Sequence, residues 1–290
     1  MNAQRATQTV LITGATDGLG KAAALLLAGR GYRVFAAGRS AEKRAQLDAL
    51  AKEKQLPLET LEMDVCDDAS VQKAIALVYQ KSATLDVLIN NAGLAYVATV
   101  EDMTMEDWRR QFETNFFGVI RVTQAVLPKM RERRHGRILM MSSVSGLVTP
   151  PTQAAYSASK HALEGLSNAL RHELYPFGVE TVLIEPGYIV TNIQQTAVEV
   201  AQPYLDKIKK GPYARVYASA WEGAKSSRAK SNTTPEDCAR IILQAIEAPN
   251  PRARYGVTSL ATMLKWAKRL LPDSAIDAMI RRRYGITREI

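Results

Sequence analysis

The stretch TGATDGLG at residues 13–20 decides how this chain folds. It follows the largely apolar run TVLI at residues 9–12 and precedes the run AAALLL at residues 22–27, an order that predicts strand, glycine-rich turn and helix. Gly14, Gly18 and Gly20 let the backbone approach a pyrophosphate group, whose charge the N–H groups at the helix start would meet. The spacing G-x-x-x-G-x-G therefore predicts a phosphate-binding turn, with a glycine-rich helix cap as the alternative.

The composition is that of an ordinary globular protein. The chain has 290 residues, of which 47% are hydrophobic and 23% charged, which suits one domain with a sizeable core. Cys66 and Cys238 lie far apart without metal-type spacing, so we expect reduced thiols and no metal site. The sequence lacks a run of about 18 apolar residues, so we expect no transmembrane helix and a cytoplasmic protein.

The net charge of +9 is spread over several basic clusters. Nucleic-acid binding needs a basic face together with an element that reads the bases, and the sequence offers no such module. We therefore expect no nucleic-acid partner. Most of this charge should lie on a solvated surface, and part of it should attract an anionic cofactor or substrate.

Strand-like and helix-like segments alternate along most of the chain. Apolar strands that alternate with amphipathic helices are typical of a parallel sheet covered on both faces. With right-handed crossovers they predict an α/β fold with a doubly wound, Rossmann-type parallel sheet. The predicted helix at residues 104–133 should bend or break near Pro128. The expected strands are residues 10–13, 33–37, 58–63, 86–89, 137–141, 179–185 and 254–257, and the other expected helices are residues 18–30, 41–54, 68–80, 155–175 and 235–247.

Three parts are predicted along the chain. Residues 1–258 should form one dinucleotide-binding catalytic domain, and residues 259–290 a helical C-terminal extension of two short helices split by Pro272. Residues 188–233 are too long for a plain connection, so they should cover the cleft at the carboxyl edge of the sheet. The side chains expected to line the substrate pocket are Leu94, Tyr96, Val97, Tyr188, Ile193, Tyr204, Tyr213, Tyr217 and Trp221.

The run YSASK at residues 156–160 places a phenol and an ammonium group four residues apart. On a helix Tyr156 and Lys160 share one face. A tyrosine with a pKa of about 10 is a poor acid–base catalyst, and a neighbouring positive charge lowers that pKa. Ser143 lies thirteen residues earlier, just after a predicted strand, so its hydroxyl can emerge at the same edge of the sheet. A pair on the helix surface is the alternative.

Several motifs then occur in a fixed order, and the set resembles the short-chain dehydrogenase/reductase family in its compact one-domain form. The resemblance covers about residues 8–258. The chain is most similar to the branch that holds hydroxysteroid, retinol and acyl-ketone reductases, including a C-terminal extension. The motifs are TGATDGLG at 13–20, NNAG at 90–93, Asn115, Ser142-Ser143, YSASK at 156–160, and Pro186-Gly187 with Thr191.

The resemblance implies a role for each matching catalytic position. Tyr156 would be the general acid in carbonyl reduction and the base in the reverse direction. Ser143 would hydrogen-bond the substrate oxygen and stabilise its developing charge, whereas Ser142 is interpreted as structural. Lys160 would bind the nicotinamide ribose and lower the pKa of Tyr156. Asn115 would hold a water molecule that links Lys160 to solvent as a proton relay.

The resemblance also implies a set of cofactor contacts. Asp64 and Val65 would hold the adenine, with a strand-end cap as the alternative for Asp64. Ile189 and Thr191 would contact the nicotinamide end. Asn90 would lie against the cofactor, and the residues that follow it contact the cofactor or merely form a turn. The predicted cofactor-binding residues are Gly14, Thr16, Asp17, Gly18, Leu19, Gly20, Arg39, Ser40, Asp64, Val65, Asn91, Ala92, Gly93, Tyr156, Lys160, Pro186, Gly187, Ile189 and Thr191.

The end of the second predicted strand indicates which cofactor is used. NAD-preferring sheets of this type carry an acidic residue there, and NADP-preferring ones carry an arginine for the 2′-phosphate. Here the sequence reads Ala37-Gly38-Arg39-Ser40, and the first carboxylate is Glu42. The guanidinium fork of Arg39 suits a phosphate, so we predict NADP(H). An exposed arginine that begins a helix, with either cofactor accepted, is the alternative.

The predicted activity is NADP(H)-dependent reduction of a lipophilic ketone or aldehyde, such as a steroid-, retinoid- or acyl-ketone-like compound. One alternative is an NAD-linked alcohol dehydrogenase that works in the oxidative direction. Another is a cofactor-sensing module without turnover, which the presence of all four catalytic residue types disfavours. The resemblance implies a homo-oligomer, either a dimer or a tetramer.

The C-terminal extension combines apolar and basic residues. Trp266, Leu270 and Ile280 alternate there with lysines and with Arg281-Arg282-Arg283. One hypothesis is weak association with an anionic membrane surface, which would make the protein peripheral there. The alternative is a helix pair that packs its apolar side on the core and presents a basic outer face.

Overall fold

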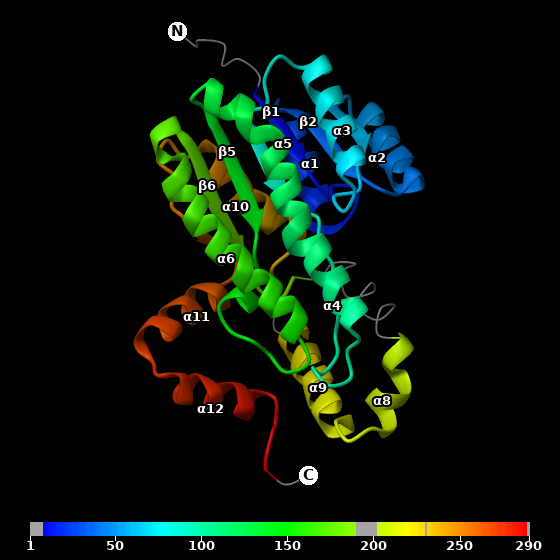
Figure 1. Ribbon diagram of the computed structural model, residues 1–290, viewed down its shortest axis with the longest axis vertical. Coiled ribbons are helices and arrows are strands. Elements are labelled where there is room, and N and C mark those ends of the chain that lie inside the picture. Colours follow the sequence, from blue (N-terminus) through cyan, green and yellow to red (C-terminus); the bar gives the residue numbers. More distant parts are fainter. Residues whose placement is uncertain (1–7, 190–201, 230, 289–290) are drawn as a thin grey trace.

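The computed structural model describes residues 8–189, 202–229 and 231–288. Seven strands form one sheet in the order β3-β2-β1-β4-β5-β6-β7, and every neighbouring pair is parallel (Figure 1). The predicted doubly wound parallel sheet is therefore confirmed. The strands are β1 (Thr9–Ile12), β2 (Arg33–Gly38), β3 (Leu58–Glu62), β4 (Val87–Asn90), β5 (Gly136–Met141), β6 (Val179–Glu185) and β7 (Arg254–Gly256).

Helices cover both faces of the sheet, because alternate strand residues point to opposite sides. On β1, Val10 and Ile12 join the core beneath one helix layer, whereas Leu11 joins the core beneath the other. Both cores consist mainly of buried aliphatic side chains, as a sheet covered on both faces requires. The first layer contains α1 (Gly18–Gly29), α2 (Ala41–Glu53) and α10 (Pro235–Glu247), and the second contains α3 (Asp68–Lys81), α5 (Gly118–Glu132) and α6 (Ala154–Leu174).

The strand order reverses between β1 and β4. From β1 the chain adds β2 and β3 on one side, and from β4 it adds β5, β6 and β7 on the other. The loops after these parallel strands all leave at the carboxyl edge, and the crevice at such a switch point is where ligands bind in open α/β sheets. The loops that follow β1, β4, β5 and β6 carry most of the residues singled out in the sequence.

The helical region expected at residues 104–133 differs from the prediction. It consists of α4 (Met105–Phe112), a π-helical turn (Glu113–Phe117) and α5, and α5 continues through Pro128. The irregularity therefore lies eleven or more residues before the proline, at the turn that contains Asn115. Turns of this type often mark functional sites, because they shift the side chains that follow them.

The segment expected to cover the cleft contains two described helices, α8 (Leu205–Lys210) and α9 (Ala214–Ala229). Tyrosine hydroxyls fasten this segment to residues 99–107. Tyr204 donates to Asp107, Tyr213 donates to Glu101 at 2.7 Å, and Tyr217 donates to Asp102 at 2.9 Å. We call these three hydrogen bonds the tyrosine clasp.

Two short helices end the chain, α11 (Ser259–Leu270) and α12 (Asp273–Arg283), with Pro272 between them as predicted. Tyr284 follows α12 and is buried, and its ring fills the space where a side chain at Gly223 of α9 would lie. The extension is therefore attached to the covering segment at its far end. Within the described ranges, none of the helices is long and apolar enough to cross a lipid bilayer.

Replacing Gly20 should destabilise the fold. A Cβ atom there would lie 2.5 Å from the carbonyl oxygen of Gly14 and would also collide with the amide of Asn91. Gly20→Ala should therefore lower the free energy of unfolding by about 1–3 kcal/mol, measured by urea denaturation. The control is Gly165→Ala on the exposed side of α6, where a Cβ atom meets nothing within 4 Å. Because alanine favours the helix more than glycine does, this substitution should raise the free energy of unfolding by up to about 1 kcal/mol. Equal effects of the two substitutions would contradict this account.

Candidate active site

The glycine-rich loop is held in place by residues that follow β4. The side-chain amide of Asn91 donates to the carbonyl oxygens of Thr13 and Gly14, both at 2.9 Å. In return the hydroxyl oxygen of Thr13 accepts from the backbone N–H groups of Asn91 and Ala92, both at 3.0 Å. Gly14 has φ +61°, and a Cβ atom there would lie 2.8 Å from the Cα of Ala92. The loop can therefore hold this shape only with glycine at this position.

Asn91 thus positions the loop, a role that the sequence did not distinguish from direct contact with the cofactor. The sequence analysis did not name Thr13 as a site residue, although a hydroxyl residue at the end of the first strand could have indicated it. Asp17 caps α1 through a 2.7 Å hydrogen bond from the backbone N–H of Gly18. The first turn of α1 lies beside the carboxyl end of β1, where its N–H groups fit the phosphates of a dinucleotide.

The prediction for Asn90 is wrong for its side chain. The amide of Asn90 donates to the hydroxyl of Thr123 on α5 at 3.0 Å, and the residue is 3% exposed. It therefore points into the core rather than toward the crevice. Since Asn90 is the last residue of β4, the alternation of side chains along the strand directs it beneath the helix layer.

The carboxyl end of β2 presents basic groups. Arg39 is exposed and lies 3.6 Å from Asp64, while Ser40 caps α2 by accepting from the backbone N–H of Lys43 at 3.2 Å. The ammonium of Lys43 contacts Asp17 at 2.6 Å, so it reaches across to the glycine-rich loop. Lys43 was not predicted as a site residue, although it lies one helical turn after Arg39. An exposed guanidinium, a hydroxyl and a helix N-terminus together fit a phosphate group.

Asp64 and Val65 follow β3 near this end of the site. The carboxylate of Asp64 accepts from the backbone N–H of Cys66 at 2.9 Å, so it closes a turn and faces Arg39 as well. Val65 is buried, and its side chain packs against Gly118 at the start of α5. Contact of these two residues with an adenine stays a prediction.

Ser143, Tyr156 and Lys160 come together at the carboxyl end of β5. The hydroxyl of Ser143 accepts from the backbone N–H of Ser145 at 3.1 Å and hydrogen-bonds the phenol of Tyr156. Lys160 is 6% exposed, and its ammonium lies 5.6 Å from the centre of the Tyr156 ring. The three side chains can therefore act on one atom in the crevice: two hydroxyls that can donate to an oxygen, with a cation behind them.

The expected effect of Lys160 on Tyr156 does not appear in this structure. Burial raises the pKa of the Tyr156 phenol, and the charge of a Tyr188 phenolate would raise it further, whereas the hydrogen bond with Ser143 lowers it. The ammonium of Lys160 instead donates to the carbonyl oxygen of Met141 at 2.7 Å. Burial also lowers the pKa of Lys160 to about 8, against a smaller opposing effect of Glu164.

Asn115 lies in the π-helical turn and is fully buried. Its amide donates to the carbonyl oxygen of Leu94 at 2.9 Å and to the hydroxyl of Ser159 at 3.2 Å, and its side-chain oxygen accepts from the N–H of Leu94. The hydroxyl of Ser159 in turn donates to the carbonyl oxygen of Tyr156 at 2.7 Å. Asn115 therefore joins the loop after β4 to the helix that carries Tyr156, and the water that it would hold stays a prediction.

A buried ionic cluster behind Lys160 was missed by sequence reasoning. Ser142 donates to Glu164 at 2.5 Å, which agrees with its structural interpretation. The guanidinium of Arg254 on β7 lies 3.0 Å from Glu164 and 3.3 Å from Glu185, the last residue of β6. Glu164 is one helical turn after Lys160, so the cluster fixes α6 to the edge of the sheet. Nothing in the sequence relates three charges from distant segments.

The loop after β6 closes the other side of the site. Pro186 accepts from the backbone N–H of Val144 at 2.9 Å, and Gly187 packs tightly against Thr258. Ile189 is 6% exposed and belongs to the core on the side of α1 and α10. Thr191 lies outside the described residues, as does Ile193.

The predicted pocket residues separate into different groups. Tyr204 and Tyr217 are buried, and their hydroxyls donate the hydrogen bonds of the tyrosine clasp, so they anchor the covering segment. Trp221 is 63% exposed and points outward. Tyr188 is close to the reacting groups, because it affects Tyr156 electrostatically and its hydroxyl lies 3.2 Å from that of Tyr284.

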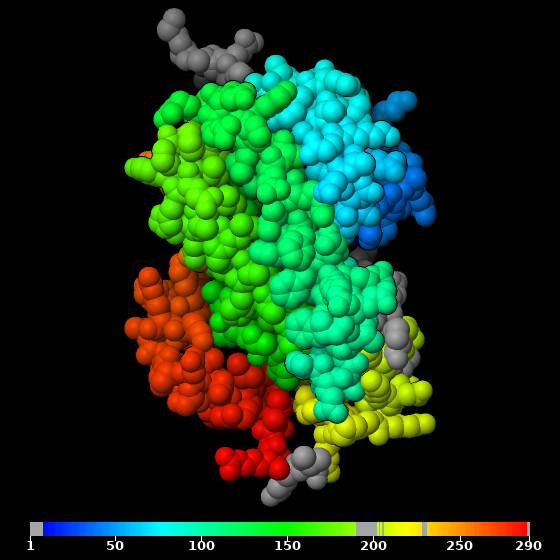
Figure 2. Space-filling model, viewed as in Figure 1, coloured from blue at the N-terminus to red at the C-terminus, as the bar shows by residue number. Residues whose placement is uncertain are grey.

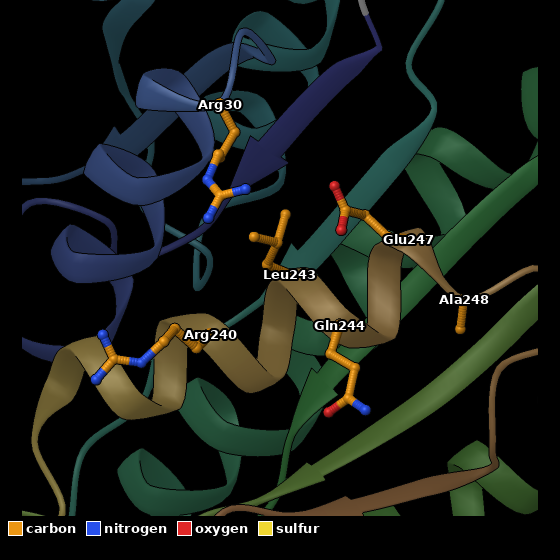
Figure 3. Close-up of a pocket in the computed structure, with 6 residues that line it drawn as sticks. All are labelled: Arg30, Arg240, Leu243, Gln244, Glu247 and Ala248. Carbon is orange, nitrogen blue, oxygen red and sulfur yellow. The ribbon is translucent and has the colours of Figure 1, made fainter.

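A shallow hollow elsewhere on the surface is unrelated to these groups. Figure 3 shows it between the end of α1 and the helix α10, at the amino edge of the sheet. It combines Arg30 and Glu247 with an aliphatic side chain and offers no set of hydroxyls or acids directed at one point. The residues around it are Arg30, Arg240, Leu243, Gln244, Glu247 and Ala248.

Comparisons with known proteins relate this chain to one protein family. The family model described as short chain dehydrogenase matches residues 8–201. An uncharacterized oxidoreductase of Bacillus subtilis is 36% identical over 94% of this chain and 97% of its own length. An NADPH-dependent 3-dehydrocapnine reductase of Ornithobacterium rhinotracheale is 34% identical, covering 92% and 94%, and a 3-ketodihydrosphingosine reductase of Bacteroides thetaiotaomicron is 32% identical, covering 96% and 98%.

Solved structures show the same similarity. A short-chain dehydrogenase from Streptomyces avermitilis superposes with a TM-score of 0.77 at 28% identity, covering 98% of both chains. An actinorhodin polyketide ketoreductase with NADPH superposes with a TM-score of 0.74 at 28% identity, covering 89% of this chain and 97% of its own.

The buried cluster should make stability depend on pH. Burial and the neighbouring Glu164 raise the pKa of Glu185 from 4.5 to about 7. Between these values the folded protein binds more protons than the unfolded chain, so the free energy of unfolding should fall as the pH rises from about 4.5 to 7. Glu185→Gln should remove up to about 3 kcal/mol of that fall in denaturant titrations at pH 5 and pH 8.

The control for this prediction is Glu173→Gln, which replaces an exposed carboxylate on α6 and should leave the pH dependence of the parent protein unchanged. If Glu185→Gln and the parent protein lose the same stability between pH 5 and pH 8, Glu185 does not titrate in this range.

Proposed function

This chain belongs to the short-chain dehydrogenase/reductase family, and on that premise we propose that it is an NADP(H)-dependent reductase of lipophilic ketones or aldehydes. The observation that carries the proposal is the meeting of Ser143, Tyr156 and Lys160 at the same edge as the glycine-rich loop. A phosphate cradle beside two hydroxyls and a buried cation fits hydride transfer to a carbonyl group.

The residues at this edge fit a nicotinamide dinucleotide. Gly14 and Gly20 allow the loop to pack tightly against Asn91, and this packing places the N-terminus of α1 at the carboxyl edge of β1, where its N–H groups suit a pyrophosphate. The bound cofactor would supply the hydride. The hydroxyl of Tyr156 would give a proton to the carbonyl oxygen, and Ser143 would hydrogen-bond the same oxygen as negative charge develops on it.

The reductive direction rests on the proposed preference for NADP(H), since cells usually keep that cofactor reduced. Burial raises the pKa of the Tyr156 phenol, so the phenol carries the proton that it would donate to the carbonyl oxygen. An NAD-linked alcohol dehydrogenase is the competing function, and the assays below separate the two.

Three observations support NADP(H) over NAD(H). Arg39 is exposed at the end of β2, beside Ser40 and the N-terminus of α2. Lys43 adds a second positive charge within the same turn. One relative is named an NADPH-dependent reductase, and the similar polyketide ketoreductase structure holds NADPH.

The substrate class follows from the surroundings of the site. Tyr188 affects Tyr156 electrostatically and lies beside Tyr284, and helices α8 and α9 lie over the carboxyl edge (Figure 1). A relative is named for reducing a 3-keto compound, 3-ketodihydrosphingosine. We therefore propose a bulky, largely apolar carbonyl compound as the substrate.

Tyr156→Phe tests the proton donor. It should lower kcat for NADPH-dependent reduction by about 100-fold or more, because general acid catalysis contributes that much. The reaction is followed at 340 nm with a panel of steroid, retinoid, long-chain and small aromatic carbonyls. NADPH binding, measured by fluorescence, should be retained in the variant, and full activity of the variant would exclude Tyr156 as the acid.

Arg39→Ala tests the cofactor preference. It should raise KM for NADPH by about 10- to 100-fold, since a charge-assisted hydrogen bond to the 2′-phosphate is lost, and should leave KM for NADH almost unchanged. Arg30→Ala, an exposed arginine at the amino edge of the sheet, is the matched control. Equal changes for both cofactors would refute the role of Arg39.

A further inference from the structure

The C-terminal helices expose an unusual set of large apolar side chains. Met263, Trp266 and Leu270 are 50%, 53% and 76% exposed, and their spacing of three and four residues places them on one face of α11. Leu271, which follows α11, and Met279 on α12 are also exposed, at 40% and 42%. We call these five residues the tail face.

The structure speaks against the alternative in which the helix pair packs its apolar side on the core. The residues that attach the pair to the body are Ala261, Ile276 and Tyr284, which are buried. Met263, Trp266 and Leu270 of α11 are exposed, whereas Leu260 and Leu264 are half-buried. Figure 2 shows the C-terminal segment, in orange and red, as an outer part of the molecule beside the yellow covering segment.

Charge surrounds the tail face. Residues 259–288 contain seven lysines and arginines but two aspartates. Arg281 and Arg282 are exposed, and the guanidinium of Arg269 lies 6.0 Å from the ring of Trp266. Apolar and aromatic groups bordered by cations are the composition of helices that lie on anionic bilayers. A second copy of this chain would instead bring two basic surfaces together.

The tail face also has a direct connection to the active site. Tyr284 ends α12, and its hydroxyl lies 3.2 Å from that of Tyr188, in the loop after β6. The ring of Tyr284 packs on Gly223 of α9. The surface that would meet a bilayer is therefore attached to both the reacting site and the segment that covers it.

We propose that the tail face docks on an anionic lipid surface, with α11 and α12 lying flat on it and Trp266 and Leu270 entering the headgroup region. Because no described helix is long and apolar enough to cross a bilayer, the helices would rest on the surface. Docking would place the pocket where apolar substrates partition, and this consequence rests on the proposed function. The docking itself is independent of that function.

The test is sedimentation of the full chain with vesicles of phosphatidylcholine alone and of phosphatidylcholine with about one-third phosphatidylserine. At low salt the protein should pellet with the anionic vesicles only, and binding should weaken as salt rises. Equal binding to both kinds of vesicle, or none to either, would overturn the proposal. The assay contains neither cofactor nor substrate, so it is independent of the reductase assays.

Two variants locate the docking surface. Trp266→Ser combined with Leu270→Ser should weaken binding to anionic vesicles at least tenfold, and so should Arg281→Ala combined with Arg282→Ala. The matched controls are Tyr175→Ser, an exposed aromatic residue at the amino edge of the sheet, and Lys52→Ala with Lys54→Ala at the end of α2. Controls that weaken binding as much as the tail variants would contradict the assignment.

A second copy of the chain is the other occupant to distinguish. Sedimentation velocity of the parent protein and of the Trp266/Leu270 variant measures the oligomeric state. If that variant changes a dimer into a monomer and the parent protein does not bind anionic vesicles, the tail face is an interface between copies and the membrane proposal fails. An unchanged oligomeric state with loss of vesicle binding supports it.

Discussion

The glycine-rich loop after β1 lies so close to the residues that follow β4 that no side chain fits at Gly14 or Gly20. Asn91 packs against this loop and donates to two of its carbonyl oxygens. This contact holds the N-terminus of α1 over the crevice and sets where a dinucleotide can lie. The proposed reacting groups lie at the same edge of the sheet, so their position relative to a cofactor depends on a contact that carries no chemistry of its own.

Burial shifts the pKa values of Tyr156 and Lys160 in opposite directions, because it favours the neutral form of each group. It favours the neutral phenol of Tyr156 and disfavours the ammonium of Lys160. Glu164 offsets part of the effect on Lys160, and the same carboxylate holds Arg254 and accepts from Ser142. The charge state of the site is thus linked to the cluster that fastens α6 to β7. Because a buried cluster of this kind is costly to break, it keeps the catalytic helix in one position.

Much of the fold could be predicted from local patterns. The apolar runs that became β1, β4 and β6 are short and lie between helical periods, which is enough to identify a doubly wound sheet. Ser143, Tyr156 and Lys160 were predicted together because motif order links them. The position of the irregular turn at Glu113–Phe117 was not predicted, because Pro128 is the stronger local signal for a bend. The turn is held by buried contacts of Asn115 with Leu94 and Ser159, which are distant in the sequence. The Glu164–Arg254–Glu185 cluster and the inward direction of Asn90 depend on tertiary packing in the same way.

The tyrosine clasp has a mechanical consequence. Its three phenols all come from the covering segment, and their carboxylate partners all lie within residues 101–107, at and just before the start of α4. A displacement that lifts both α8 and α9 from residues 99–107 must break all three hydrogen bonds. Losing three hydrogen bonds costs more free energy than losing one, so the clasp favours the arrangement in which both helices stay against those residues.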